Sequence, residues 1–200
     1  MQDPKPNIAV ITSVLNIKNM VCSCCIRVLK EDFEKAGVLV QKIRLGEVVI
    51  CYDPEKTNFN IIEKIIKDCG FELIADKEKL LVEQIKLAVI ELIHYYNNAN
   101  SLIRNSDYLI EKLGYTYQYL SSIFSKHENI TLEKYIILQK IEKVKELLDF
   151  ENYTLSEISF MMGYSSVQYL SNQFKQITNV SVSDYKKNKN AERRPLNELY

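Results

Sequence analysis

The sequence predicts an α+β protein in two parts, a small mixed domain of strands and helices followed by an all-helical domain. Residues 14–74 alternate between strand-like and helix-like hydrophobic patterns, residues 77–188 show helical patterns throughout, and the helical part contains one motif twice. With 200 residues, of which 46% are hydrophobic, the chain can form two domains that each bury a core.

Six elements are expected in the first domain, residues 1–76, whose core spans about 14–74. Apolar and polar residues alternate over 14–19, and 38–45 and 48–53 are rich in residues that favour strands. Ile26, Leu29 and Phe33 recur on one face of the first helix. The expected order is strand 14–19, helix 23–36, strands 38–45 and 48–53, helix 57–69 and strand 71–74. This β-α-β-β-α-β order is typical of the ferredoxin-like arrangement.

The second domain, residues 77–188, is expected to contain helices alone. It begins with a long amphipathic helix at 77–97, and a loop rich in Asn follows at 97–101. Further helices are expected at 106–113, 117–128, 132–149, 155–162, 166–177 and 181–188, before a loose polar tail at 189–200.

An internal repeat defines the second domain. LGYTYQYLSSIFSK (113–126) matches MGYSSVQYLSNQFKQ (162–176) with one inserted residue. In each copy a glycine, Gly114 or Gly163, stands where a tight turn between two helices needs a positive φ. Thr116 and Ser165 are expected to cap the helices that follow. The repeat therefore predicts two helix-turn-helix units, at about 106–128 and 155–177.

The second helix of each unit has an apolar and a polar face. The apolar faces are formed by Tyr119, Leu120, Ile123 and Phe124, and by Tyr169, Leu170 and Phe174. The polar faces, with the residues next to them, carry Tyr117, Gln118, Ser121, Ser122, Ser125, Lys126, Ser165, Ser166, Gln168, Ser171, Asn172 and Lys175. Gln, Asn and Ser pair with base edges and Lys favours phosphates, so these residues are the predicted contacts to double-stranded DNA.

Residues 106–187 resemble the DNA-binding domain of the AraC/XylS family of bacterial regulators. KIEKVKELL (140–148) is similar to the family's linker helix, and LSEISFMMGYSSVQYLSNQFKQ (155–176) to its second-unit signature. Residues 182–187 are similar to its closing segment. The resemblance implies a sequence-specific transcription regulator in which one helix joins two helix-turn-helix units.

The chain departs from that family at four positions. Ser122 and Asn172 stand where many members have Arg, which removes cations from the expected DNA face. Asn129 and Asn179 stand where a Gly usually follows each recognition helix, and Asn tolerates the left-handed conformation next best. Since the formal net charge is zero, the prediction of DNA binding depends on the motif and not on bulk electrostatics.

Three cysteines, Cys22, Cys24 and Cys25, lie between the first expected strand and helix. Cys22 and Cys25 form a C-x-x-C at a helix N-terminus, which lowers thiolate pKa values. Two thiolates suit a soft ion of low coordination number such as Cu(I), whereas Zn(II) needs four ligands. The sequence therefore predicts a soft-metal site at Cys22 and Cys25, with Cys24 as a further candidate ligand.

Residues 15–74 resemble the heavy-metal-associated (HMA) domain of copper chaperones and metal-pumping ATPases. NMVCSCC (19–25) stands where that family has Gly-Met-Thr-Cys-x-x-Cys, and Gly70-Phe71 stands for its Gly-Tyr. The resemblance implies metal binding at Cys22 and Cys25, with Met20 packed inward. Asn19 in place of Gly and the additional Cys24 depart from the pattern.

Several alternatives remain open for the first domain. The thiols could form a redox switch, the domain could carry metal to or from a partner protein, or it could serve only in dimerisation through its exposed sheet face or helix 77–97. Cys51 and Cys69 are expected to be ordinary buried residues.

No enzyme is predicted, because catalytic triads, phosphate loops and dinucleotide fingerprints are missing from the sequence. His94 is expected to be structural and 140–146 to be the solvated face of the linker helix. The sequence shows no signal peptide or membrane span, and free thiols favour the cytoplasm.

Overall fold

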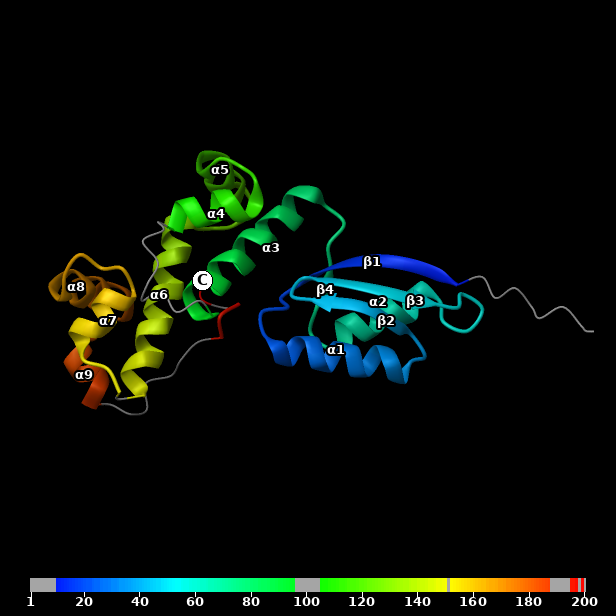
Figure 1. The fold of residues 1–200 in the computed structure, drawn as a ribbon, viewed down its shortest axis with the longest axis horizontal. Helices are drawn as coiled ribbons and strands as arrows, with labels where there is room; N and C mark the ends of the chain where they lie inside the picture. Colours follow the sequence, from blue (N-terminus) through cyan, green and yellow to red (C-terminus); the bar gives the residue numbers. More distant parts are fainter. Residues whose placement is uncertain (1–9, 96–104, 151, 188–194, 198, 200) are drawn as a thin grey trace, which may run out of the picture. The chain divides into compact units, whose positions relative to one another are not determined.

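The computed structural model describes residues 10–95, 105–150, 152–187, 195–197 and 199. The chain divides into two compact units, Met1–Glu83 and Gln84–Tyr200, and the division falls within the helix α3 (Lys77–Ile90). The described strands all belong to the first unit, and helices form the second (Figure 1). The predicted loop 97–101 and most of the tail 189–200 lie outside the described residues.

The first unit has the predicted order of strands and helices. The elements are β1 (Ile11–Lys18), α1 (Ser23–Lys35), β2 (Leu39–Arg44), β3 (Glu47–Tyr52), α2 (Phe59–Asp68) and β4 (Glu72–Leu73). The four strands form one antiparallel sheet in the order β2-β3-β1-β4. Because β1 is central, the C-x-x-C that follows it is attached to the middle of the sheet.

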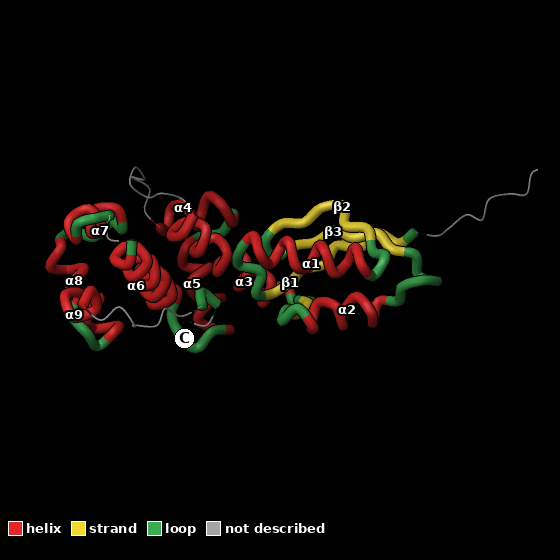
Figure 2. Tube along the Cα trace, turned by 90° about the horizontal axis from the view of Figure 1, so that it is seen from below, coloured by secondary structure: helices red, strands yellow, loops and turns green. Residues whose placement is uncertain are grey.

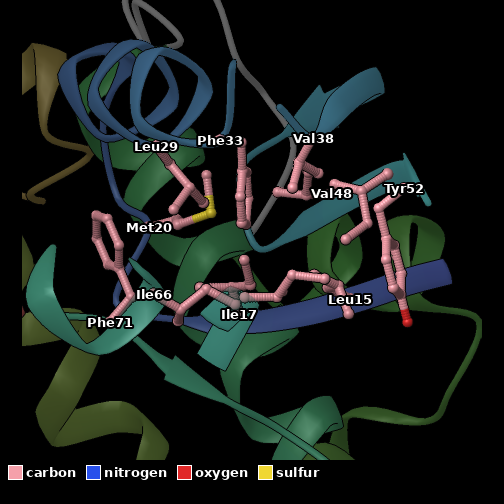
Figure 3. Packing of buried hydrophobic residues seen from close by; sticks show 12 residues of the cluster. Leu15, Ile17, Met20, Leu29, Phe33, Val38, Val48, Tyr52, Ile66 and Phe71 are labelled. Atoms are coloured by element: carbon pink, nitrogen blue, oxygen red, sulfur yellow. The ribbon is translucent and has the colours of Figure 1, made fainter. Parts of the chain in front are cut away.

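Both helices of the first unit cover the same face of this sheet (Figure 1, Figure 2). Phe33 of α1 and Ile66 of α2 are fully buried against the strands, and Met20 lies among them (Figure 3). Side chains of a strand alternate between faces, so Val14 and Leu39 belong to the opposite face. On that face Val14 is 60% exposed and Leu39 is 62% exposed.

The second unit contains all the helices predicted between residues 105 and 187, with boundaries that agree within one residue. They are α4 (Asn105–Leu113), α5 (Tyr117–His127), α6 (Leu132–Asp149), α7 (Leu155–Met161), α8 (Val167–Thr178) and α9 (Val182–Lys187). None of the described helices is both long and apolar enough to cross a membrane.

The prediction of one long amphipathic helix at 77–97 is wrong in two respects. α3 ends at Ile90, and a π-helical turn, η1 (Glu91–Tyr95), continues from it. Burial is also not confined to one stripe, because the consecutive runs 81–83 and 88–90 are both buried. A helix buried on several faces loses the contrast between apolar and polar sides that an amphipathic surface helix shows.

A buried polar network holds the second unit together around Gln139 of α6, which is fully buried. Its amide nitrogen donates to the hydroxyl of Tyr135 at 3.0 Å and to the carbonyl of Leu196 at 2.9 Å. Its amide oxygen lies 2.9 Å from Nε2 of His94 in η1. Both N–H donors and the oxygen of the amide are thus used, and the prediction that His94 is structural is confirmed.

Candidate nucleic-acid interface and candidate metal site

The first helix-turn-helix unit consists of α4 and α5. Gly114 begins the turn between them with φ of +74°, which confirms its predicted left-handed conformation. Thr116 caps α5, because its hydroxyl accepts a hydrogen bond from the backbone N–H of Tyr119 at 3.3 Å. Leu120 and Phe124 of α5 are fully buried and fix the helix on the core of the unit.

The second helix-turn-helix unit, formed by α7 and α8, repeats this geometry, but its capping residue differs from the predicted one. Gly163 has φ of +68° as predicted. The residue that caps α8 is Ser166 and not Ser165, since the hydroxyl of Ser166 accepts from the backbone N–H of Tyr169 at 3.1 Å. Ser165 is therefore the inserted residue, and Ser166 is the counterpart of Thr116 in the first unit.

The helix α6 joins the two helix-turn-helix units and contacts helices of both (Figure 1). Its 18 residues span ~27 Å at the ~1.5 Å rise of an α-helix. The prediction that 140–146 is a solvated face is wrong, because Glu142 and Lys145 are both buried. They pair with each other at 2.5 Å, so the charges are neutralised where helices from both sides exclude water.

The predicted DNA contacts on α5 form one face of that helix. Gln118, Ser122, Ser125 and Lys126 are exposed, and Ser121 is half-buried between them. Positions 118, 121, 122 and 125 follow the i, i+3, i+4, i+7 spacing of a single helical face. An elongated surface can therefore reach all four side chains at once.

The corresponding face of α8 is organised by its own hydrogen bonds. Gln168, Asn172 and Lys175 are exposed, as are Ser165 and Ser166 before the helix. The amide of Gln168 donates to the side-chain oxygen of Asn172 at 2.9 Å. This bond leaves one N–H and the side-chain oxygen of Gln168 for an external partner such as a base edge.

Two of the predicted contacts use their hydroxyl groups inside the protein. Tyr117 donates to a carboxylate oxygen of Glu133 at 2.9 Å, and Ser171 donates to the carbonyl of Val167 at 2.9 Å. Burial and the neighbouring carboxylate hold the pKa of Tyr117 well above its ordinary value. Tyr117 therefore remains protonated, and its hydroxyl anchors α5 to α6.

The assignment of Tyr119 and Tyr169 to the apolar core faces is wrong. Tyr119 is 44% exposed and Tyr169 is 54% exposed. Their rings lie against Tyr115 at 5.3 Å and Tyr164 at 5.9 Å between centroids. Each tyrosine precedes a buried leucine and so lies about 100° around the helix from it. That offset was the available signal, and it adds two phenol groups to the exposed faces of α5 and α8.

The two asparagines that replace glycine after the recognition helices differ from each other. Asn179 caps α8 in the left-handed conformation with φ of +62°, as predicted. Asn129 does not adopt a positive φ, and the C-cap residue of α5, Glu128, has extended backbone with φ of −113°. The left-handed prediction is therefore confirmed at Asn179 and wrong at Asn129.

The thiols of Cys22 and Cys25 lie together at the start of α1. Cys22 is the N-cap residue of that helix, and the two Sγ atoms are 3.4 Å apart. Met20 beneath them is fully buried, which confirms its predicted inward packing. Asn19 has φ of +70°, so this position requires a residue that tolerates the left-handed conformation, and Asn replaces Gly with little strain.

The electrostatic surroundings make these two thiols unequal. Burial raises the pKa of Cys22, but hydrogen bonds from the backbone and side chains of Cys25 and Cys24 outweigh it, so the pKa lies below its ordinary value. Burial and the thiol of Cys22 raise the pKa of Cys25. Cys22 is therefore the first of the pair to become a thiolate, with Cys25 donating to it.

The remaining cysteines have separate surroundings. Cys24 is exposed, and the described residues contain no group of three or more His, Cys, Asp or Glu side chains that could hold one ion. Cys51 is buried and lies 3.0 Å from the hydroxyl of Thr12, as expected of an ordinary core residue. The prediction that Cys69 is an ordinary buried residue is wrong, because Cys69 is only partly buried at the edge of the core and its thiol donates to Asp32 at 3.4 Å.

The chain was compared with known protein families. Residues 109–188 match a family described as a helix-turn-helix domain. The match lies wholly within the second compact unit, Gln84–Tyr200, and includes α5 to α9. The chain therefore contains a helix-turn-helix domain. No solved structure matches the chain at a significant level.

Among curated proteins, the relatives are regulators of bacterial operons and a transposon protein. The xylose operon regulatory protein of Escherichia coli K12 is 29% identical over 99 residues, 50% of this chain and 25% of that protein. The Transposon Tn10 TetD protein of Escherichia coli is 32% identical over 83 residues, 42% of this chain and 60% of that protein. The Msm operon regulatory protein of Streptococcus mutans is 29% identical over 109 residues, 54% of this chain and 37% of that protein. The chain spans from a quarter to about 60% of the length of these relatives.

Proposed function

We propose that this chain is a transcription regulator that binds double-stranded DNA through both helix-turn-helix units. The observation that carries this proposal is the pair of exposed polar faces on α5 and α8, whose helix-turn-helix units are joined by the single helix α6. A linker of ~27 Å is compatible with two recognition helices that enter major-groove segments one turn, ~34 Å, apart. The operon-regulator names of the relatives support the same function.

Direct readout of bases is assigned to the amides on these faces. Gln118 and Gln168 occupy equivalent positions in the repeat, and both are exposed. A glutamine amide pairs in two places with the edge of adenine, at ~1–3 kcal/mol of discrimination for each good pair. Because Ser122 and Asn172 carry no charge, phosphate contacts on these faces depend on Lys126 and Lys175, and affinity should fall only moderately with salt.

The test begins with selection of binding sites from a random duplex library by the purified chain. The expected result is an enriched site of two half-sites about one helical turn apart. Gln118→Ala and Gln168→Ala should each relax the preference at one half-site, while Gln84→Ala, an exposed glutamine on α3, serves as the matched control. Enrichment of no sequence over the starting library would refute the proposal.

We further propose that the first compact unit, Met1–Glu83, has a ferredoxin-like and HMA-like arrangement and senses a soft metal ion such as Cu(I). The support is the pair of sulfurs 3.4 Å apart at the start of α1. Two sulfurs that share one ion at ~2.3 Å each lie no more than ~4.6 Å apart, so this pair fits a single ion. Cys22 and Cys25 would hold the ion, and Cu(I) would supply a soft Lewis acid that prefers thiolate ligands.

The residues of the chain prepare this site in three ways. Cys22 provides the thiolate at lower pH than Cys25, because its pKa is depressed by the hydrogen bonds around it. The buried Met20 and the left-handed Asn19 hold the loop in place. For sensing, the affinity for metal must differ between the DNA-bound and the free chain, since coupling between sites is reciprocal.

The measurement is an anaerobic titration of the reduced chain with Cu(I) against a competing chelator. The expected result is one Cu(I) per chain, lost in Cys22→Ser and in Cys25→Ser and retained in the matched control Cys69→Ser. Unchanged DNA affinity with and without Cu(I) would remove the sensing proposal. Loss of two protons by mass spectrometry after mild peroxide, with no copper binding, would instead assign the pair to a thiol switch.

A further inference from the structure

We propose that the linker helix α6 orients each recognition helix through one tyrosine held by one charged side chain, with Glu133 holding Tyr117 and Lys140 holding Tyr164. This inference rests on the proposed DNA-binding function and names the positioning residues for it. Tyr117 is the first residue of α5, and Tyr164 lies in the turn that leads into α8. The two contacts differ in chemistry but have the same effect on a recognition helix.

In the first helix-turn-helix unit, the contact between the recognition helix and α6 is a hydrogen bond to a charged group. The hydroxyl of Tyr117 donates to a carboxylate oxygen of Glu133 at 2.9 Å. Hydrogen bonds to an ionised acceptor are roughly twice as strong as neutral ones. Because Tyr117 begins α5, this bond restrains the rotation of α5 about its own axis as well as its distance from α6.

In the second helix-turn-helix unit, the contact between α6 and α8 passes through the aromatic ring of Tyr164. The ammonium group of Lys140 donates to the carbonyl of Met162 at 2.9 Å and lies 5.5 Å from the centroid of the Tyr164 ring. The first contact satisfies a carbonyl at the end of α7. The second is within the range of a cation–π interaction. Lys140 thus holds both the end of α7 and the turn.

Tyr164 passes this restraint on to the recognition helix at two points. Its hydroxyl donates to the amide oxygen of Gln173 at 2.6 Å. Its ring packs on Tyr169 at 5.9 Å between centroids, with the planes inclined at 58°. Since Tyr169 and Gln173 are four residues apart on α8, Tyr164 contacts one side of that helix over a full turn.

The internal repeat shows that the two helix-turn-helix units contact α6 through different tyrosines. The counterpart of Tyr117 in the second helix-turn-helix unit is Val167, which has no hydroxyl. The counterpart of Tyr164 in the first unit is Tyr115, which is 46% exposed. Each unit therefore has its own tyrosine contact to the linker helix.

The two charged residues occupy related positions on α6. Glu133 and Lys140 are seven residues apart, which places them on nearly the same face, two turns or ~10.5 Å apart along the axis. A single face of the linker helix therefore sets the orientation of both recognition helices, and with it the separation and phase of the two DNA half-sites that they can reach together.

The experiment compares Lys140→Met and Glu133→Met in the full chain by hydrogen exchange without DNA. Lys140→Met should speed exchange of α8 amides about tenfold while α5 is unchanged, and Glu133→Met should do the reverse, as expected for loss of one charge-assisted contact. Lys140→Arg and Glu133→Gln keep a donor and an acceptor and should restore most of the protection. Lys134→Met, an exposed lysine of the same helix, is the matched control.

The second readout is affinity for the selected duplex and for duplexes with one base pair added or removed between the half-sites. The wild-type chain should prefer one spacing. Both Met variants should lose about tenfold at that spacing, lose their spacing preference, and bind a single half-site as before. An unchanged spacing profile, or an equal loss in Lys134→Met, would overturn the inference.

The two readouts separate this inference from the proposed function. If the wild-type chain selects no DNA but exchange changes in the crossed pattern, the contacts position the helices and only the DNA-binding proposal fails. If exchange rises equally in α5 and α8 in both Met variants, the residues act on general stability, and the inference fails whether or not DNA binds. If Lys140→Met does not fold, Glu133→Met and Tyr164→Leu, which removes the ring next to Lys140, decide the same question.

Discussion

Replacement of Gln139 by leucine should lower the free energy of unfolding of the second compact unit, Gln84–Tyr200, by ~2 kcal/mol. Three hydrogen bonds of its amide are lost, to Tyr135, Leu196 and His94. At ~1 kcal/mol for each bond the loss is ~3 kcal/mol, and access of water to the half-buried Leu196 and His94 reduces it to ~2 kcal/mol. Leucine has a similar volume, so no cavity contributes to the change.

Tyrosine fluorescence in a urea titration reports this loss selectively. The chain has 13 tyrosines and no tryptophan, and Tyr52 is the one tyrosine in the first unit. With an m value of ~2 kcal/mol/M, the unfolding midpoint of Gln139→Leu should fall by ~1 M. The matched control is Gln84→Leu at an exposed helical position, which should stay within ~0.5 kcal/mol.

The same hydrogen bonds can be tested from the other end of the chain. Deletion of residues 195–200 removes the Leu196 acceptor together with the buried Leu199. Combined with Gln139→Leu, the two losses should be less than additive by ~1 kcal/mol, because they share one hydrogen bond. A midpoint for Gln139→Leu equal to that of Gln84→Leu, or strict additivity with the deletion, would refute the reasoning.

Two further predictions follow from particular positions. Asn179→Ala should cost ~1 kcal/mol of stability because φ of +62° strains alanine, whereas Asn179→Gly should be neutral and Asn129→Ala should stay within ~0.5 kcal/mol; equal urea midpoints for the two Ala variants would contradict this. Cys22 should be alkylated by iodoacetamide faster than Cys69 at pH 8, since the pKa of Cys22 is lowered while burial and Asp32 raise the pKa of Cys69 to about 11. A lower pKa gives a larger thiolate fraction at a given pH, so the Cys22 rate should level off at lower pH, and peptide mass spectrometry that finds Cys69 faster would reverse the assignment.

The order of the elements and most of their boundaries can be predicted from local patterns in the sequence. Helices α4 to α9 begin and end within one residue of their predicted positions. Their limits depend on local chemistry, such as the glycines at +74° and +68° and the Thr154–Glu157 capping box of α7. These signals act over a few residues, so no tertiary contact is needed to recognise them.

The sequence also predicted the position of the thiol pair and of the polar faces, since both depend on short spacings. A C-x-x-C at a helix start brings two sulfurs within 3.4 Å through one turn of backbone. The faces of α5 and α8 follow directly from helical periodicity. Whether metal or DNA occupies these sites depends on groups outside the chain.

Which surfaces are covered depends on contacts between helices that are distant in the chain. The charges of Glu142 and Lys145 are typical of a solvated face, yet both residues are buried because helices of both helix-turn-helix units pack on α6. Gln139 bonds to residues 45 and 57 positions away in the chain. The contacts of Lys140 with Met162 and Tyr164 are likewise distant in sequence. Such partners depend on how helices pack, and helix packing is not encoded in the periodicity of any single helix.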